Sequence, residues 1–290
     1  MDTKDLKSFS VGSIRGLFIY LGEILIWPIC RLVTWYDDIF KTTIADKYFD
    51  GNTELTNCDL GSITSLEEAL FNTDVKRLDD LSKFTNCRVI DYMCNACTSL
   101  ESMSCVFPDS VYSASGMFVS ADSDTGGYID AAECRRFRGF LSYSSIWFAP
   151  EIKFKHFTER DGEHYILVDD FFRGARQLRS IPKYDASGWY WEGGGLLGYS
   201  SDKYTYNYLT DIGGFTDFGF NYHSVTLFLG LCPNLSNQSV QNIIDGLYSR
   251  AGTAHTSYVI FHNNVYNSIT EDQLALAASK NWIIGSYPDD

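Results

Sequence analysis

The sequence is poor in positive charge. Lysine and arginine together number 23, against 37 aspartates and glutamates, which leaves a net charge of −14. Contacts with nucleic-acid phosphates need clustered lysine and arginine, so this balance argues against nucleic-acid binding. It also disfavours adsorption to an anionic membrane surface. Aromatic residues are abundant instead, at 16% of the chain, and the apolar content of 45% is ample for a core.

The sequence also lacks an uninterrupted hydrophobic run that could span a membrane, which takes ~20 apolar residues without charge. Its most hydrophobic stretch, residues 17–30, contains Glu23 and Pro28, and Arg31 follows directly. Glu23 and the absence of a small-residue cleavage site disfavour a secretory signal peptide as well. A cap within the chain and a membrane anchor stay open as alternatives for this stretch.

Apolar residues nevertheless recur through this stretch at helical spacing, with much of the opposite face also apolar, as in a buried helix. We therefore expect a hydrophobic helical segment within residues 1–48 that docks the chain to a partner protein or to a second copy. The expected docking residues are Leu17, Phe18, Leu21, Ile24, Leu25 and Trp27.

Motifs of common enzymes are missing. The chain has no G-x-S-x-G, no H-E-x-x-H and no phosphate-binding loop. His164 lies near Glu163, Asp169 and Asp170, but acidic residues beside a strand are more often a solvated face than an acid–base group. We expect neither enzymatic activity nor a cofactor. The alternative, a glycan-degrading enzyme, requires two carboxylates facing one cleft, roughly 5 to 10 Å apart.

Eight cysteines permit disulfides, yet several fall inside a repeated pattern where a small apolar residue is needed. We expect reduced, buried thiols. The Cys94-x-x-Cys97 pair has the spacing of half a zinc site. Core packing is the favoured interpretation, because Cys94 stands where other copies of the pattern have phenylalanine.

That pattern places a large apolar residue or Cys first, Gly or Ala two residues later, and Leu at the sixth or seventh step. It recurs in 49–58, 94–103, 172–181 and 228–235. The expected anchors follow one another at a nearly regular spacing: Phe49, Phe71, Cys94, Phe118, Phe148 and Phe172. Their period, in the low to middle twenties for most steps, falls in the leucine-rich-repeat range. The prediction is an α/β fold, an irregular leucine-rich-repeat solenoid over residues 49–235, in which stacked copies share one core.

Two insertions interrupt the pattern and carry the candidate sites. Residues 122–133 resemble a twelve-residue calcium loop, with Asp122, Asp124, Asp130 and Glu133 as candidate ligands. The flanking helix is weak, so an acidic turn with Ile129 beginning a strand is favoured and no metal is expected. A second insertion offers a possible ligand surface: Trp189, Trp191, Tyr204, Tyr206 and Tyr208. The three tyrosines alternate, so we expect them on one face of a strand. The tryptophans could stack a sugar ring or equally pack under the glycine loop or against a neighbouring chain.

Residues 236–290 show the signals of capping repeats. Ser236 can cap a helix whose apolar residues recur at helical spacing. Residues 257–262 have the composition of a strand. Thr270 and Gln273 form a capping box before a second helix. A short strand from Trp282 to Ile284 closes this series.

Residues 209–218, L-T-D-I-G-G-F-T-D-F, and 231–248, L-C-P-N-L-S-N-Q-S-V-Q-N-I-I-D-G-L-Y, resemble the end of BspA-like leucine-rich-repeat proteins. The T-E-D-Q-L-A-L-A-A-S-K-N-W stretch is similar to the terminal unit of that family, and C-T-S-L-E-S-M to its internal repeats. The resemblance implies surface proteins of gut Bacteroidales and structural proteins of their phages, which bind proteins or glycans. It brings no catalytic residues.

From this resemblance and the absence of a signal peptide, we expect a phage structural or adhesion protein, associated with a fibre or tail, that recognises a host protein or glycan. The solenoid would supply the recognition surface, and the N-terminal segment would dock it to the virion. The alternative is a bacterial cell-surface adhesin of the same repeat class.

Overall fold

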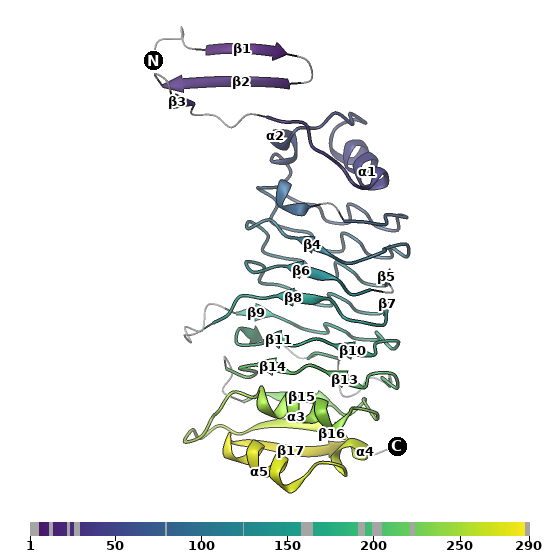
Figure 1. Ribbon diagram of the computed structural model, residues 1–290, viewed down its shortest axis with the longest axis vertical. Coiled ribbons are helices and arrows are strands. Elements are labelled where there is room, and N and C mark those ends of the chain that lie inside the picture. Colours follow the sequence, from purple (N-terminus) through teal and green to yellow (C-terminus); the bar gives the residue numbers. More distant parts are fainter. Residues whose placement is uncertain are drawn as a thin grey trace.

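The computed structural model describes residues 6–11, 14–21, 24–25, 30–78, 80–123, 125–157, 165–190, 195–198, 205–220 and 224–287, with side chains from residue 30 onward. Figure 1 shows the chain advancing along one long axis as a column of short strands and turns, with helices near its two ends. The fold mixes many short strands with few helices.

A small antiparallel sheet lies at the N-terminal end. Its strands are β1 (Leu6–Val11), β2 (Ile14–Leu21) and β3 (Ile24–Leu25), in the order β1-β2-β3. Val11 pairs with Ile14, and Tyr20 pairs with Leu25. The predicted docking helix is therefore wrong. An apolar run alone does not separate helix from strand, and β-branched and aromatic residues such as Ile14, Ile19 and Tyr20 favour strands.

The residues expected to dock are thus placed on strands. Leu17, Phe18 and Leu21 lie in β2, and Ile24 and Leu25 form β3, all described by their backbone alone. Trp27 lies outside the described residues. Among the helices in the described part of the chain, none has the length and apolar content needed to cross a membrane.

Helix α1 (Asp38–Tyr48) covers the N-terminal end of the core. Asp37 caps it, and Phe40, Ile44 and Ala45 are its buried residues. The Phe40 ring stacks on Phe84 at 6.3 Å between centroids. This helix falls within the range that the sequence assigned to docking, yet it packs on the chain's own core.

Helix α2 (Asn57–Leu60) follows, with a capping box between Thr56 and Asp59. A disulfide joins Cys58 to Cys30, across a sequence separation of 28. The expectation of reduced cysteines is wrong for this pair, because the antiparallel bridge between Leu32 and Thr56 brings the two segments together. It is confirmed for the six others, which are free and buried: Cys87, Cys94, Cys97, Cys105, Cys134 and Cys232.

Beyond η2 (Leu81–Lys83) and the turns around it, successive segments pair in parallel. One line of isolated bridges runs Ser65–Val89–Ser113–Arg136–Leu167, with nearly equal steps as far as Arg136 and a longer last step. Along this line an amide of each segment donates to a carbonyl of the next, and the four such bonds are Leu66 to Val89, Ile90 to Ser113, Ala114 to Arg136 and Phe137 to Leu167. These bonds satisfy backbone polar groups next to the core.

Two columns of left-handed backbone mark where each segment turns. One comprises Glu68, Tyr92, Gly116, Gly139 and Asp170, and the other comprises Asn72, Ala96, Ser120, Tyr143 and Gly174. All ten have φ between 52° and 72°. Most side chains disfavour this conformation, so a turn that demands it twice in each segment admits glycine readily and other residues at a cost.

Short parallel strands continue the column along its other sides. On one side β4 (Cys105–Val106), β6 (Tyr128–Asp130) and β8 (Glu151–Lys153) form a sheet. On another, β5 (Asp122–Ser123) pairs with β7 (Ser145–Ile146). Further along, β9 (Ile166–Leu167) pairs with β12 (Trp189–Tyr190), β10 (Ser180–Ile181) with β13 (Asp211–Ile212), and β11 (Tyr184–Asp185) with β14 (Phe215–Thr216).

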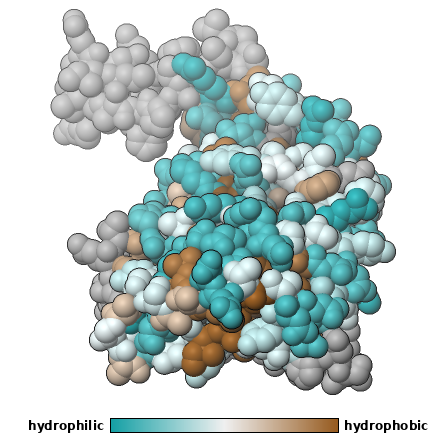
Figure 2. Space-filling model, turned by 60° about the horizontal axis from the view of Figure 1, so that its bottom comes forward, coloured by the Kyte–Doolittle hydropathy of each residue, from teal (hydrophilic) through white to brown (hydrophobic). Residues whose placement is uncertain are grey.

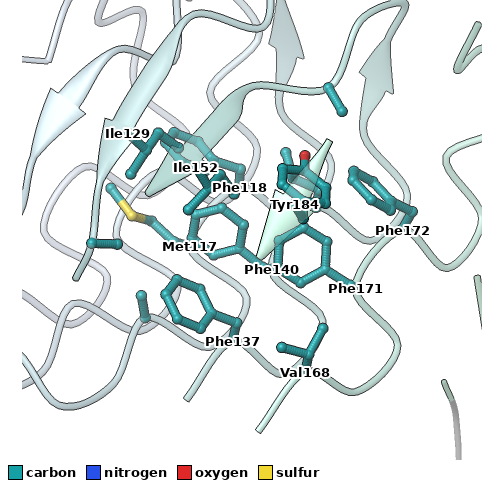
Figure 3. Packing of buried hydrophobic residues seen from close by; sticks show 14 of the residues in the cluster. Met117, Phe118, Ile129, Phe137, Phe140, Ile152, Val168, Phe171, Phe172 and Tyr184 are labelled. Carbon is teal, nitrogen blue, oxygen red and sulfur yellow. The ribbon is translucent and has the colours of Figure 1, made fainter. Parts of the chain in front are cut away.

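A single hydrophobic core runs through the column, from Phe40 to Trp282. Figure 3 shows its aromatic centre, where Phe140 and Phe171 lie together at 5.2 Å between ring centroids. The register that the sequence assigned to Cys94, Phe118 and Phe172 is confirmed, since each occupies the same step of the hydrogen-bond ladder. All three are buried.

Three of the expected anchors are misplaced by the sequence. Phe49 ends helix α1, where its amide donates to the carbonyl of Ala45. Phe71 is 50% exposed and Phe148 is 45% exposed. The buried residues at the corresponding steps are Leu70 and Leu141, whose amides donate to Met93 and Phe171. Matching by spacing alone found Phe71, which directly follows its core position, and Phe148, which lies in the next stretch of the chain after Leu141.

The C-terminal end is a three-stranded parallel sheet with helices. Its strands are β15 (Thr226–Leu229), β16 (Ser257–His262) and β17 (Trp282–Tyr287). Helix α3 (Asn237–Asp245) starts at the predicted cap Ser236, α4 (Asn263–Tyr266) follows β16, and α5 (Glu271–Ser279) starts at the predicted capping box. The predicted helices and strands of this end are confirmed, and β17 continues beyond the predicted strand to Tyr287. Strand β15 pairs with β16 although it precedes the predicted boundary at residue 236.

Contacts between helices and turns close this end. Lys280 Nζ donates to the carbonyls of Ile244, Asp245 and Leu247 at 2.7–3.1 Å, at the C-terminal end of α3. Figure 2 brings the C-terminal end forward and shows a mainly hydrophilic surface, with hydrophobic residues gathered toward its lower middle.

A candidate ligand-binding hollow

Two of the three described residues of the ligand surface expected from the sequence are buried. Trp189 is 1% exposed and Tyr206 is fully buried. The Tyr206 hydroxyl accepts from the amide of Gly174 at 2.8 Å and lies 2.9 Å from the carbonyl oxygen of Phe172. No alternating strand forms at Tyr206 and Tyr208, because this segment turns instead. Trp191 and Tyr204 lie outside the described residues.

Tyr208 is different, since 60% of it is exposed. Together with Trp147, Gln177 and Arg179 it lines a hollow of about 220 Å³. These side chains come from three consecutive segments of the column. Phe148, next to Trp147, bridges in parallel to Ser180, and Ser180 pairs in parallel with Asp211.

Backbone bonds fix these segments to one another beneath the hollow. The amide of Arg179 donates to the carbonyl of Trp147 at 2.8 Å. The amide of Thr210, two residues after Tyr208, donates to the carbonyl of Arg179 at 3.0 Å. Side chains carried on such bonded segments hold their relative positions, as a preformed binding site requires.

Side-chain contacts then order the lining. Trp147 Nε1 donates to Gln177 Oε1 at 3.0 Å. The Arg179 guanidinium carbon lies 4.1 Å from the centroid of the Trp147 ring, which is a close cation–π contact. Trp147 still keeps 39% of its surface exposed. The lining therefore presents the partly exposed rings of Trp147 and Tyr208, and the Arg179 guanidinium packs on the first of them.

The hollow carries positive charge and no acid among its described lining residues. Asp211, beside it in the register, accepts from Thr210 Oγ1 at 2.7 Å. An acid–base pair of carboxylates, as a glycosidase uses, is therefore not built by the residues that line it. The arrangement can bind a ligand through ring stacking and hydrogen bonds.

The calcium-loop candidates separate onto different strands. Asp122 is in β5, Asp130 is in β6, and Ile129 is buried in β6 as the favoured strand interpretation required. Asp130 Oδ2 lies 2.8 Å from Lys153 Nζ. Glu133 Oε2 lies 3.3 Å from Lys155 Nζ. Asp124 lies outside the described residues, and across the described ones no three His, Cys, Asp or Glu side chains gather as a metal site would need.

The cysteine pair and the acidic residues near His164 were the remaining candidates from the sequence. Cys94 and Cys97 are buried in the core, where burial raises the pKa of Cys94 well above its usual value. A hydrogen bond from Cys94 lowers the pKa of Cys97 to about 7. Asp169 is buried and accepts from the amide of Gly195 at 3.2 Å. Glu163 and His164 lie outside the described residues.

Comparison with known proteins adds no assignment: no protein-family model matches this chain, and no curated protein matches it.

Sequence reasoning missed three of the four residues that line the hollow: Trp147, Gln177 and Arg179. A usable signal was present, because the step along the chain from Phe148 to Ser180 nearly equals the step from Ser180 to Asp211. Extending that register would have placed Trp147 beside Arg179 and near Tyr208.

Proposed function

We propose that this chain is a non-enzymatic recognition protein that binds a saccharide in the hollow formed by Trp147, Gln177, Arg179 and Tyr208. The observation that carries the proposal is the exposure of two aromatic rings, 39% for Trp147 and 60% for Tyr208, on segments joined by backbone hydrogen bonds. Exposed aromatic rings in a preformed concavity are costly to keep in water and are typical of binding sites.

The size and chemistry of the hollow suit one sugar unit of a longer chain. Its volume of about 220 Å³ lies below the range of roughly 300 to 1,000 Å³ that holds a drug-sized ligand. A sugar ring has an apolar C–H face that packs on an aromatic ring and an edge of hydroxyls that bind polar groups. Tyr208 offers the ring, while Gln177 and Arg179 offer the polar groups.

The column itself is proposed to be an irregular leucine-rich-repeat solenoid of the BspA-like kind. Parallel pairing at nearly equal steps from Ser65 to Arg136 supports this assignment, as do the paired columns of left-handed turns. Each segment contributes one layer to a shared core, which is how stacked repeats gain stability. The longer step from Arg136 to Leu167 is an irregular repeat with an insertion.

This protein is proposed to be part of a phage virion, associated with a fibre or tail. Residues 1–29 are proposed to join it to other virion proteins or to copies of itself. The second candidate is a bacterial cell-surface adhesin. The Cys30–Cys58 disulfide supports exposure to an oxidising environment, which virion surfaces and cell surfaces share.

Saccharide binding is tested by retention of the purified full chain on immobilised host polysaccharides. Trp147→Ala should lower the affinity about tenfold, or on the order of 1 to 2 kcal/mol, since it removes a ring of the hollow and the contacts that order Gln177 and Arg179. The matched control is Tyr112→Ala, which removes a ring that is 48% exposed and lies outside the hollow. Equal retention of both variants would show that the hollow is not the saccharide-binding site.

Location is tested by labelling with antibodies against this chain. Decoration of purified phage particles at a fibre or tail is the expected result. Decoration of uninfected bacterial cells would instead establish the adhesin. Saccharide products released after prolonged incubation would show an enzyme and overturn the non-enzymatic assignment.

A further inference from the structure

We infer that the hollow selects sugars bearing an acidic group, with Arg179 as the residue that determines this specificity. The inference rests on the proposed function, because it names the chemical class of the saccharide that the same site would take. It follows from three observations: Arg179 stacks on Trp147, it has no anionic partner among the described residues, and the Gln177 amide lies beside it.

Arg179 is held in a way that leaves its donors available. Its guanidinium stacks on the Trp147 ring, with 4.1 Å from the guanidinium carbon to the ring centroid. Stacking occupies a face of the guanidinium, whereas its five N–H donors point outward in the plane. Its backbone is bonded on both sides, to Trp147 and to Thr210. The cation is therefore ordered in advance without using the edge that binds carboxylate or sulfate in two parallel bonds.

Arg179 also lacks an anionic partner among the described residues, within a chain whose net charge is −14. Some other described cations on the column have one: Arg77 lies 3.0 Å from Glu101, and Lys153 lies 2.8 Å from Asp130. Asp211, on the adjacent segment, accepts from Thr210 and forms no ion pair with Arg179. An ordered cation without a carboxylate in so acidic a protein is an open site for an anion.

Gln177 adds a second donor at the same place. Its Oε1 accepts from Trp147 Nε1 at 3.0 Å, which orients the amide and leaves the Nε2 hydrogens available to donate. The polar groups beside Tyr208 are therefore a guanidinium and an amide NH₂. A carboxylate or sulfate accepts from both and forms charge-assisted bonds with the guanidinium, whereas a neutral sugar hydroxyl forms only the weaker uncharged-acceptor bonds. An acidic sugar thus matches the hollow better than its neutral counterpart.

The test uses pairs of polysaccharides that differ only in charge. Polygalacturonate is compared with its methyl ester, hyaluronan with its carboxyl-reduced form, and dextran sulfate with dextran. Binding of the full chain is measured at about 0.15 M salt, where the Debye length of about 8 Å screens the surface charge of the protein. We expect at least one acidic member to bind about tenfold more tightly than its neutral partner, as charge-assisted hydrogen bonds provide. Which pair responds distinguishes a carboxylate from a sulfate.

Arg179→Gln should abolish that difference while the exposed side chain leaves the fold intact. Arg179→Lys, which keeps the charge but loses the planar fork, should retain only part of it. Lys183→Gln removes one exposed positive charge four residues further along the chain and is the matched control, with no change expected. Loss of selectivity in Lys183→Gln to the same extent would show a general charge effect and overturn the role of Arg179.

The remaining outcomes separate this inference from the function on which it rests. Equal binding of acidic and neutral members, lost in Trp147→Ala, would overturn the selectivity and leave saccharide recognition standing. Absence of binding to any member of the panel and to host polysaccharide would overturn both.

Discussion

The ring of Tyr143 covers Gly174 on the next segment of the column: a Cβ at Gly174 would come within 2.5 Å of Tyr143 Cδ1. The two residues are successive members of one left-handed column, with φ of 59° and 72°. The same packing recurs between Tyr92 and Gly116, where a Cβ would come within 2.3 Å of the ring. A tyrosine of one segment thus depends on a glycine of the next.

Gly174→Ala should destabilise the protein by about 2 to 4 kcal/mol, since it adds a steric clash to the cost of a positive φ. Gly139→Ala is the matched control, with φ of 61° and its closest contact, Ser142 Oγ, at 3.4 Å. It should cost only about 1 kcal/mol. Urea unfolding of both variants measures the difference, and equal losses would show that the tyrosine contact contributes nothing.

The aromatic centre of the core predicts a second contrast. Phe171 is fully buried and contacts the rings of Phe140, Phe172 and Tyr184 at 4.8–6.4 Å between centroids. Phe171→Ala should cost about 3 to 5 kcal/mol because it leaves a cavity. Phe71→Ala, at a position that is 50% exposed, should change the free energy of unfolding by less than about 1 kcal/mol. A large loss in Phe71→Ala would contradict the register.

The disulfide predicts a defined pattern of thiol chemistry. Intact protein should resist alkylation at its six buried cysteines and yield one crosslinked peptide pair, Cys30 with Cys58, on mass mapping. Replacing both by serine should lower the stability of the N-terminal end by about 3 to 4 kcal/mol, from the entropy of closing a loop with a sequence separation of 28. Melting curves with and without reductant provide an independent measurement, and identical curves would show that the bond is not formed in solution.

Asp37 predicts a loss of stability in acid. Burial acts to raise its pKa, but hydrogen bonds from the amides of Phe40, Lys76 and Arg77 oppose this, and the net pKa is lowered from 3.8. A lowered pKa means that the folded state favours the carboxylate. The contribution is therefore present above pH 3.8 and is lost as pH falls through the folded pKa.

Asp37→Asn should reduce stability at pH 7 by about 1 to 2 kcal/mol, and the gap to the wild type should close in strong acid. Asp38→Asn, one residue along the exposed side of α1, is the control. Melting temperatures measured at intervals between pH 7 and pH 2 show whether the gap closes. A gap that stays constant over this range would contradict a role for the charge.

Local signals in the sequence were the most dependable. Ser236, Thr270 and Gln273 cap the helices that they were expected to cap, because caps depend on residues a few positions apart. Cys94 and Phe172 were placed in the correct register because both carry the whole pattern, down to the left-handed Ala96 and Gly174. Phe71 and Phe148 were misplaced because spacing alone does not identify which apolar residue of a segment enters the core.

Contacts between residues far apart in the chain could not be predicted from local sequence patterns. The N-terminal strands were predicted as a helix because an apolar run fits both periods. Tyr206 was assigned to a ligand surface because it alternates with its neighbours, whereas its hydroxyl finds its partners inside the column. Trp189, for which ligand stacking and packing were both open, is buried. The hollow joins Trp147 to Tyr208, which lie far apart in the sequence and are brought together by two parallel pairings that no short motif encodes.

The measurement that tests the central claim most directly is a calorimetric titration with the saccharide that the panel identifies, comparing Trp147→Ala/Tyr208→Ala with Tyr112→Ala/Tyr128→Ala. Each variant removes two exposed rings, but only the first pair lines the hollow. We predict that the first loses affinity about 100-fold and that the second binds as the wild type does, with melting temperatures of both within about 2 °C of it. Equal affinity of the two double variants would contradict recognition by this hollow.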